Sequence, residues 1–496
     1  MGNEKMDEIE KPIDVQEWTK GITHYTNNSP DLIIKHVERD KKGAVFLYLD
    51  NMINHQEFSM LLLNLDQMKV LKYEELEPLI LTKKISYSSE LLQTVDAINT
   101  GAVCLLMENE TKCMLISLSK LVERPLSASE NESMIFGPSI TFSESISTNI
   151  ALLRKNITDR NLCTEKFLVG ERNSTEVRIV YIKDIANEDN IATMKQRIQD
   201  LKIDDPIDSN VLAQLLDDNS LSLFPQALTT ELPDRVCYML GKGKIAIFVD
   251  RSPSVIIAPS SFLNFFETTD DVYTRWNIGS FLRIVRFIAM MLSLLLTPAY
   301  VAALTYHYEI IPSPLLLSLG QSRASVPFPP VLEALILEFI LELLRESGAR
   351  LPTKVGQTMG IVGGIVIGQA AVDAGFTSNI LIIIIALSAL GTFTAPSYMM
   401  GAVIRIVRFP LIILAGLWGG IGLIFGLLYI IIHLLKLTSF GTPYLVPIYP
   451  FRFSDWKDSL FRVPPQYAGK RPETNRPIDI IRYSRTNAKQ RKDIDE

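Results

Sequence analysis

Three glutamates lie four residues apart in a largely apolar stretch: Glu338, Glu342 and Glu346. At about 100° per residue, this spacing puts the three carboxylates along one face of a helix. A row of carboxylates can attract cations to the mouth of a channel, because rings of acidic side chains serve that purpose in cation channels. The same pattern also suits an amphipathic helix that lies in the membrane interface with its acids in water. Both interpretations stay open.

Four glycines recur at the same spacing in the next apolar run, residues 355–372: Gly356, Gly360, Gly364 and Gly368. In a water-soluble helix each would cost roughly 1 kcal/mol relative to alanine. In a bilayer, a stripe of small residues lets a second helix approach closely. The run therefore predicts a membrane helix whose glycine side packs against another helix.

The opposite side of this predicted helix carries polar and apolar side chains together. They are Thr358, Val362, Gln369 and Asp373, with Ile365 and Val366 at the edges. Polar groups at membrane depth face protein or water rather than lipid. This face therefore suits a pore lining in which Val362 and Val366 form an apolar constriction. In the alternative, Thr358 and Gln369 hydrogen-bond to neighbouring helices and hold them together.

No catalytic pattern accompanies these residues. The histidines lack metal-ligand spacing, and the motifs GxSxG, HExxH and GxGxxG are missing from the sequence. The sequence GKGK at residues 241–244 lacks the spacing of a phosphate-binding loop. The four cysteines form no CxxC motif, which favours reduced side chains. We expect no enzymatic activity, no metal site and no cofactor.

Composition divides the chain into a polar first half and an apolar second half. The length of 496 residues suggests about three domains. The net charge of −6 and the lack of a basic patch argue against nucleic-acid binding.

The first half predicts an α/β region of two subdomains after a mobile N-terminus, residues 1–30. The subdomains cover residues 31–130 and 131–275, with a linker rich in Ser, Glu, Asn and Pro near residues 125–138. Apolar periodicity predicts strands at 43–50, 176–185 and 244–250, a hairpin at 102–118, and helices at 55–68, 89–99, 143–157 and 191–201.

The second half predicts an all-α, multi-span membrane domain over residues 276–436. The expected spans are 287–306, 355–372, 380–404 and 409–435, with an amphipathic or re-entrant segment at 310–350. A basic tail, residues 437–496, follows.

Charge around the spans predicts their direction. Arg275, Arg283 and Arg286 flank the first span, and the tail carries 11 Lys and Arg against 7 Asp and Glu, so 11 − 7 = +4. Both features place the N-terminal region and the tail in the cytosol, which an even number of crossings allows. Arg405 and Arg408 would then lie in an outer loop, against the rule. If 310–350 also crosses, the tail lies outside.

The sequence resembles the A subunit of GerA-type spore germination receptors from about residue 135 to 465. The densest match is PFPPVLEALILEFILELLRESGARLPTKVGQTMGIVGGIVIGQAAVDAG, residues 327–375. Further matches are TNIALLRKNITDRNL (148–162), SLFPQ (222–226), ELPDRV (231–236) and YTRW (273–276). The chain departs from the family at 136–139, where FGPS replaces an Arg-Gly-Pro-Arg-like stretch.

The resemblance implies an integral protein of the spore inner membrane that takes part in spore germination. It implies two partners: a transporter-like B subunit that holds the nutrient, and a lipoprotein C subunit. It further implies a homo-oligomer, a pentamer, that forms a nutrient-gated cation channel. Under this interpretation the face of Thr358 and Gln369 lines the ion path.

Two other functions remain open on the sequence. A transporter could bind and move the nutrient itself, since interrupted helices also occur in transporters. A scaffold could recruit partners through its polar half and use its spans only as an anchor.

Overall fold

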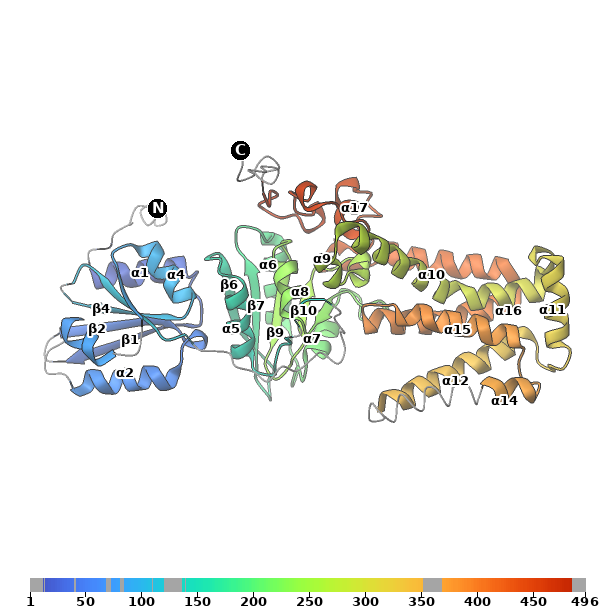
Figure 1. Ribbon diagram of the computed structural model, residues 1–496, viewed down its shortest axis with the longest axis horizontal. Helices are drawn as coiled ribbons and strands as arrows, with labels where there is room; N and C mark the ends of the chain where they lie inside the picture. Colours follow the sequence, from blue (N-terminus) through green and yellow to red (C-terminus); the bar gives the residue numbers. More distant parts are fainter. Residues whose placement is uncertain are drawn as a thin grey trace, which may run out of the picture.

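The computed structural model describes residues 12, 14–39, 42–67, 73–80, 84–108, 110–119, 136–138, 140–350 and 368–483. Two α/β subdomains and a helical bundle follow one another along the long axis (Figure 1). The bundle lies at the end opposite the first subdomain, which gives the predicted order of an α/β region followed by an all-α domain.

The first subdomain is a five-stranded antiparallel sheet of order β1-β2-β4-β5-β3. Its strands are β1 (Leu32–Arg39), β2 (Lys42–Leu49), β3 (Ile85–Ser88), β4 (Ala102–Met107) and β5 (Cys113–Ser117). Its helices are α1 (Val15–Tyr25), α2 (His55–Gln67), α3 (Tyr73–Leu76) and α4 (Leu91–Asn99), with 3-10 helices η1 (Asp50–Met52) and η2 (Glu77–Ile80). Helices α1 and α4 cover one face, while α2 and α3 cover the other. The pairing of β4 with β5 confirms the predicted hairpin.

The second subdomain repeats this topology. Its strands are β6 (Leu162–Val169), β7 (Thr175–Ile182), β8 (Leu228–Thr230), β9 (Ile245–Val249) and β10 (Val255–Ala258), in the order β6-β7-β9-β10-β8. Its helices are α5 (Ile146–Asn156), α6 (Glu188–Asp200), α7 (Ser209–Leu216) and α8 (Pro233–Leu240). Counted from its own first strand, the order is again first-second-fourth-fifth-third. The two subdomains are therefore structural repeats.

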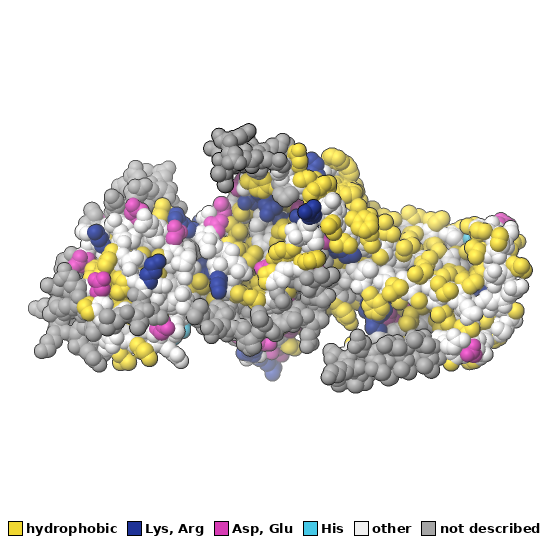
Figure 2. Space-filling model, in the orientation of Figure 1, with side chains coloured by type: hydrophobic (Ala, Val, Ile, Leu, Met, Phe, Trp, Pro, Cys, Tyr) yellow, Lys and Arg dark blue, Asp and Glu magenta, His cyan; other side chains and the backbone are white. Residues whose placement is uncertain are grey.

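The bundle follows the 3-10 helix η3 (Phe262–Phe266) and the short helix α9 (Asp270–Tyr273). It contains α10 (Trp276–Tyr306), η4 (Tyr308–Ile310), α11 (Ser313–Arg323), α12 (Pro330–Arg350), α14 (Gly368–Asp373), α15 (Asn379–Phe393) and α16 (Tyr398–Lys436). Among the described helices, α10 and α16 are long and apolar enough to cross a membrane. Apolar side chains cover much of the bundle surface in Figure 2.

The prediction of one span at 380–404 is wrong. Helix α15 ends at Phe393, and α16 begins only at Tyr398, after a connection that contains Pro396. Proline lacks a backbone N–H and disfavours helical conformation in the residue before it, which explains the break. The predicted loop around Arg405 and Arg408 is also wrong, because both arginines lie inside α16.

The prediction of one continuous span at 409–435 is wrong as well, because α16 turns back on itself. Gly419 has φ 61° and ψ −139°, a conformation that side chains with a Cβ rarely adopt. Beyond the turn, the arms approach so closely that a Cβ built at Gly422 would clash with the carbonyl oxygen of Leu414. The helix thus forms two antiparallel arms, residues 398–418 and 420–436, in close contact.

The tail packs on the second subdomain. Its elements are β11 (Thr438–Ser439), β12 (Thr442–Pro443), α17 (Phe453–Ser459), η6 (Pro465–Tyr467) and η7 (Glu473–Asn475). The Tyr444 hydroxyl donates a hydrogen bond to the Pro225 carbonyl at 2.8 Å, and Asn475 donates to the Lys242 carbonyl at 2.9 Å. The start of α10 and the end of α16 therefore lie at the same end of the bundle (Figure 1).

Candidate functional site in the helical bundle

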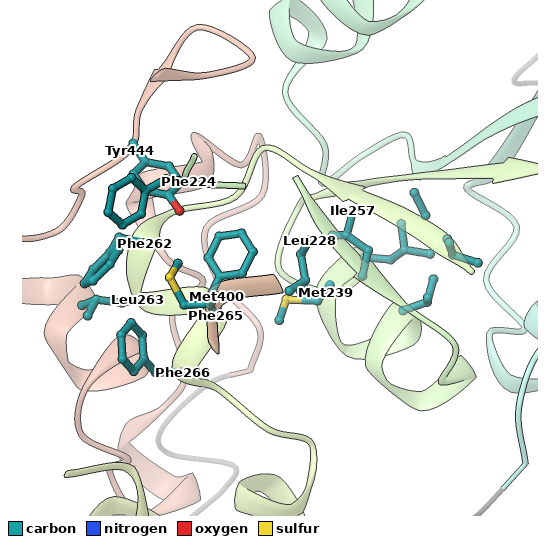
Figure 3. Close-up of a cluster of buried hydrophobic side chains, with 14 of the residues drawn as sticks. Phe224, Leu228, Met239, Ile257, Phe262, Leu263, Phe265, Phe266, Met400 and Tyr444 are labelled. Atoms are coloured by element: carbon teal, nitrogen blue, oxygen red, sulfur yellow. The ribbon is translucent and has the colours of Figure 1, made fainter. Parts of the chain in front are cut away.

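One apolar core joins the second subdomain, the bundle and the tail. Phe262 and Phe265 of η3 pack against Tyr444 of the tail, with ring centroids 6.2 Å apart in each pair. Met400 of α16 and Met290 of α10 belong to the same buried cluster. Figure 3 shows Met400 among these aromatic side chains. A displacement of α16 at this end must therefore disturb the core of the subdomain.

A buried ion pair crosses the bundle between α12 and α16. Both carboxylate oxygens of Glu338 accept hydrogen bonds from Nη1 of Arg408, at 2.9 and 2.8 Å. Each side chain is only 3% exposed. An unpaired charge at such a site would be costly, so each residue depends on the other.

Hydroxyl groups from two further helices complete this network. Nη2 of Arg408 donates to Ser293 of α10 at 2.5 Å and to Thr392 of α15 at 3.1 Å. Thr297 of α10 donates to Glu338 at 3.0 Å. Four helices therefore meet at one ion pair. Within the described part of the chain, only Nε of Arg408 is left without a hydrogen-bond partner in this pair.

A second buried carboxylate, Glu333, lies five residues before Glu338 on α12. It pairs with Nη1 of Arg323 at 2.8 Å and accepts hydrogen bonds from the Thr377 hydroxyl at 3.0 Å and the Ser378 backbone N–H at 2.6 Å. It thereby fixes the C-terminal end of α11 and the N-terminal end of α15 to α12.

The other two predicted ring glutamates lie nearer the C-terminal end of α12. Glu342 is half-buried and pairs with Nη1 of Arg345 at 2.5 Å and with Nε of Arg405 at 3.3 Å. Glu346 is exposed and pairs with Arg350 at 2.5 Å. The three carboxylates thus form a row of ion pairs that runs from the bundle interior to its surface. A ring between several copies of the chain stays a prediction.

Most of the predicted pore-lining helix lies outside the described residues. This applies to the pore-face candidates Thr358, Val362, Ile365 and Val366 and to the glycines Gly356, Gly360 and Gly364. Gln369 and Asp373 are exposed on α14, where the Gln369 amide donates to the Asp373 carboxylate at 3.0 Å. Among the residues that the structure describes, none has an atom within 4 Å of a Cβ built at Gly368.

Two of the three arginines that flank the first span, Arg283 and Arg286, have an acidic partner at the base of α10. Nε of Arg283 donates to the buried carboxylate of Asp271 at 3.1 Å, and Arg286 pairs with the same carboxylate. Nη1 of Arg283 also donates to the backbone carbonyls of Asp458 and Ser459 in α17, at 2.6 and 3.0 Å. Asp271 and Arg283 therefore join α9, α10 and the tail.

Two buried lysines lie beside this junction in contrasting environments. Lys242 pairs with Asp458 at 2.7 Å and Glu267 at 3.2 Å. Burial lowers its pKa, but these two carboxylates outweigh that effect and raise the pKa above its ordinary value. Lys244 donates to the Asn264 amide oxygen at 2.6 Å. Burial lowers the pKa of Lys244 to about 7, although Glu267 opposes the shift.

Lys244→Met should make the stability of the chain less dependent on pH above neutrality. Between pH 7 and its ordinary pKa, the buried Lys244 is neutral while the unfolded chain binds a proton, so stability rises with pH by up to about 1.4 kcal/mol per unit. Thermal unfolding of the detergent-solubilised chain at pH 7.5 and 9.5 checks this. The melting temperature of the variant should exceed that of the unmodified chain by more at pH 7.5 than at pH 9.5. Lys242→Met is the control and should lose stability at both pH values. If Lys244→Met changes the melting temperature equally at the two pH values, the prediction is contradicted.

The sequence predicted the carboxylates but missed Arg408 and its hydroxyl partners as site residues. One signal was available: Ser293 and Thr297 lie four residues apart within an apolar helix, as do Ser388 and Thr392. Such spacing places hydroxyls on one helix face, and polar groups in apolar helices tend to face protein.

Comparison with known proteins identifies the family of the chain. Residues 20–474 match the family model described as "GerA: Bacillus/Clostridium GerA spore germination protein". The chain is 41% identical over 461 residues to spore germination protein GerQA of Bacillus cereus, covering 92% of each chain. It is 35% identical over 459 residues to spore germination protein A1 of Bacillus subtilis (strain 168), covering 90% of this chain and 93% of the relative.

Among solved structures, the N-terminal domain of the A subunit of the Bacillus megaterium spore germinant receptor GerK3 is similar, with 25% identity and a TM-score of 0.41. The match covers 51% of this chain and 97% of that one. By the family match and the relatives, the chain belongs to the GerA family of spore germination proteins, the A subunits of germinant receptors.

Proposed function

We propose that the chain oligomerises in the spore inner membrane into a nutrient-gated cation channel. Its α/β subdomains and tail lie on the cytosolic side. It has no catalytic role of its own and works with a transporter-like B subunit, which binds the nutrient, and a lipoprotein C subunit. A pentamer is the expected assembly.

The supporting observation is the unoccupied space around the last glycine of the stripe. Gly391 of α15 packs so closely on α10 that a Cβ there would clash with the Ala289 carbonyl oxygen, whereas Gly320 and Gly348 lie on open surface of the described residues. At Gly368 a Cβ would likewise meet no atom of the described residues within 4 Å, and Gln369 beside it is exposed. A small-residue stripe favours close packing of helices in a bilayer. We infer that the partner of this stripe is a helix of another copy.

The exposed polar residues near the stripe fit an ion path in such an assembly. Gln369 and Asp373 are both exposed on α14, and Glu346 is exposed near the end of α12. By helical spacing, Thr358, Val362, Ile365 and Val366 extend the face of Gln369. Glu338, paired within one copy, would anchor the helices rather than contact ions.

Gly368→Leu should abolish both the oligomer in mild detergent and the cation flux of proteoliposomes that contain all three subunits. The matched control is Gly320→Leu in α11, because a Cβ at Gly320 also meets no atom of the described part of the chain within 4 Å. Potassium efflux after nutrient addition and the mass of the assembly are the two readouts. Saturable nutrient uptake without conductance would contradict the channel and support the transporter. Neither activity in the unmodified complex would support a scaffold.

A further inference from the structure

A deep apolar pocket lies between the two arms of α16, beside a loop of the second subdomain. Its volume is about 420 Å³, within the range of small-molecule sites. Val407 and Leu411 line it from the first arm, Ile430 from the second, and Leu223 and Phe224 from the loop. The turn at Gly419 creates this pocket, because it brings residues from both arms together.

One end of the pocket is polar. His433 lines the pocket, and its Nε2 shares a hydrogen bond of 2.9 Å with the hydroxyl of Ser222. Lys436 lies three residues further on, is exposed, and forms no ion pair with the carboxylates in the described part of the chain. The polar end is therefore the end at which α16 meets the subdomain.

The surface around the pocket is apolar on both the bundle and the subdomain. Phe425 and Tyr429 of α16 line the pocket and are 63% and 73% exposed. The subdomain loop beside them presents Leu221, 93% exposed, and Leu223, 54% exposed. A contiguous exposed apolar surface marks an interaction site. Because α16 is apolar enough to cross a membrane, lipid is the neighbour that fits this surface.

We propose that the pocket binds one acyl chain of an anionic phospholipid, and that the loop at residues 221–224 dips into the membrane interface beside it. The acyl chain lies along Val407, Leu411 and Ile430. The phosphate lies at the polar end, where Lys436 supplies positive charge and His433 a hydrogen-bonding ring. An acyl chain that enters the pocket moves from the apolar bilayer interior to an apolar protein surface, so it gains little free energy. The contacts of the headgroup therefore determine which lipid is retained.

This inference requires the bundle to be in a membrane but does not depend on channel activity. It gives the second subdomain a direct contact with the membrane, in addition to its contacts with α10, α16 and the tail. A lipid in the pocket would also fill the space between the two arms of α16 there. This would stabilise one distance between the arms.

The test is photo-crosslinking of the full chain in phosphatidylethanolamine liposomes that contain a diazirine-labelled phosphatidylglycerol. Labelling should concentrate on peptides from residues 406–433 and 221–224. Leu223→Glu and Lys436→Glu should each reduce it at least fivefold. Both residues are exposed, so neither change should affect folding, which thermal unfolding checks. Leu215→Glu is the matched control, an exposed leucine of α7 on the opposite face of the sheet, and should label like the unmodified chain.

Three results would overturn the proposal. The first is equal labelling of all variants. The second is equal labelling when the diazirine probe is a phosphatidylcholine, since this would remove the role of the anionic headgroup. The third is loss of labelling in the complete receptor with crosslinks from another subunit to the pocket, since the occupant would then be protein.

Discussion

Arg408→Leu should destabilise the folded chain by about 3 to 5 kcal/mol, because it leaves the Glu338 carboxylate buried without its charged partner. Ser293 and Thr392 would also lose their shared donor. The expected result is a large fall in the melting temperature of the purified chain and in its yield from membranes.

Two further variants test whether charge is the cause. Replacing the pair together by Glu338→Leu and Arg408→Met should recover most of the stability, since apolar side chains of similar size often replace buried ion pairs without loss. Glu346→Gln is the control. It removes an exposed pair with Arg350 in the i, i+4 arrangement and should cost roughly 0.3 to 0.5 kcal/mol. If Arg408→Leu melts within about 1 kcal/mol of the unmodified chain, the ion pair is not what fixes α12 to α16.

The double variant also separates folding from function. If it folds but no longer supports gated flux, the pair does more than stabilise the bundle. If flux is restored together with stability, the pair acts only by fixing the helices.

The sequence predicted most of the α/β elements because their signals are local. The prediction of a mobile N-terminus over residues 1–30 is wrong, because α1 (Val15–Tyr25) buries Trp18 and Ile22 in the core of the first subdomain. The apolar spacing at 55–68 and 102–118 is complete within each segment, and the structure places α2 and the β4–β5 hairpin there. The repeat of one topology was missed because the two subdomains share strand order rather than a recognisable residue pattern.

The helix breaks in the bundle were missed for a different reason. No charged residue lies between Asp373 and Arg405 or between Arg408 and Lys436, so uncharged length alone marks no boundary at Pro396 or Gly419. Whether a glycine in an apolar run packs against a helix or turns the chain depends on its backbone conformation. Gly419 has a positive φ, and the chain turns there.

The ion pairs could not be predicted from spacing because their partners are distant in the sequence. Glu338 and Arg408 are separated by 70 residues. The spacing of the glutamates in α12 therefore predicted an acidic row. Arg405 and Arg408, which pair with two of these glutamates, were predicted to lie in a loop. Correct placement of Arg408 required the break at Pro396.

Asp271→Ala, at the base of α10, should destabilise the folded chain about as much as Arg408→Leu does. It leaves Arg283 and Arg286 buried or half-buried without their shared carboxylate, and losing one partner of such a group costs about 3 to 5 kcal/mol. Hydrogen exchange should show faster opening of α9, of the first turns of α10 and of α17. The control is Asp270→Asn, which keeps the acceptor for the Phe136 backbone N–H at 3.0 Å and should leave exchange unchanged.

Which segments exchange faster is more informative than how much stability is lost, because Asp271 lies where α9, α10 and the tail meet. Arg283 contacts both α9 and α17, so its release should loosen the tail and the subdomain together. If the subdomain passes changes to the bundle through this junction, Asp271→Ala should also weaken nutrient-dependent flux, with the α/β subdomains still folded. Faster exchange confined to α9, with α17 unaffected, would show that the junction does not couple them.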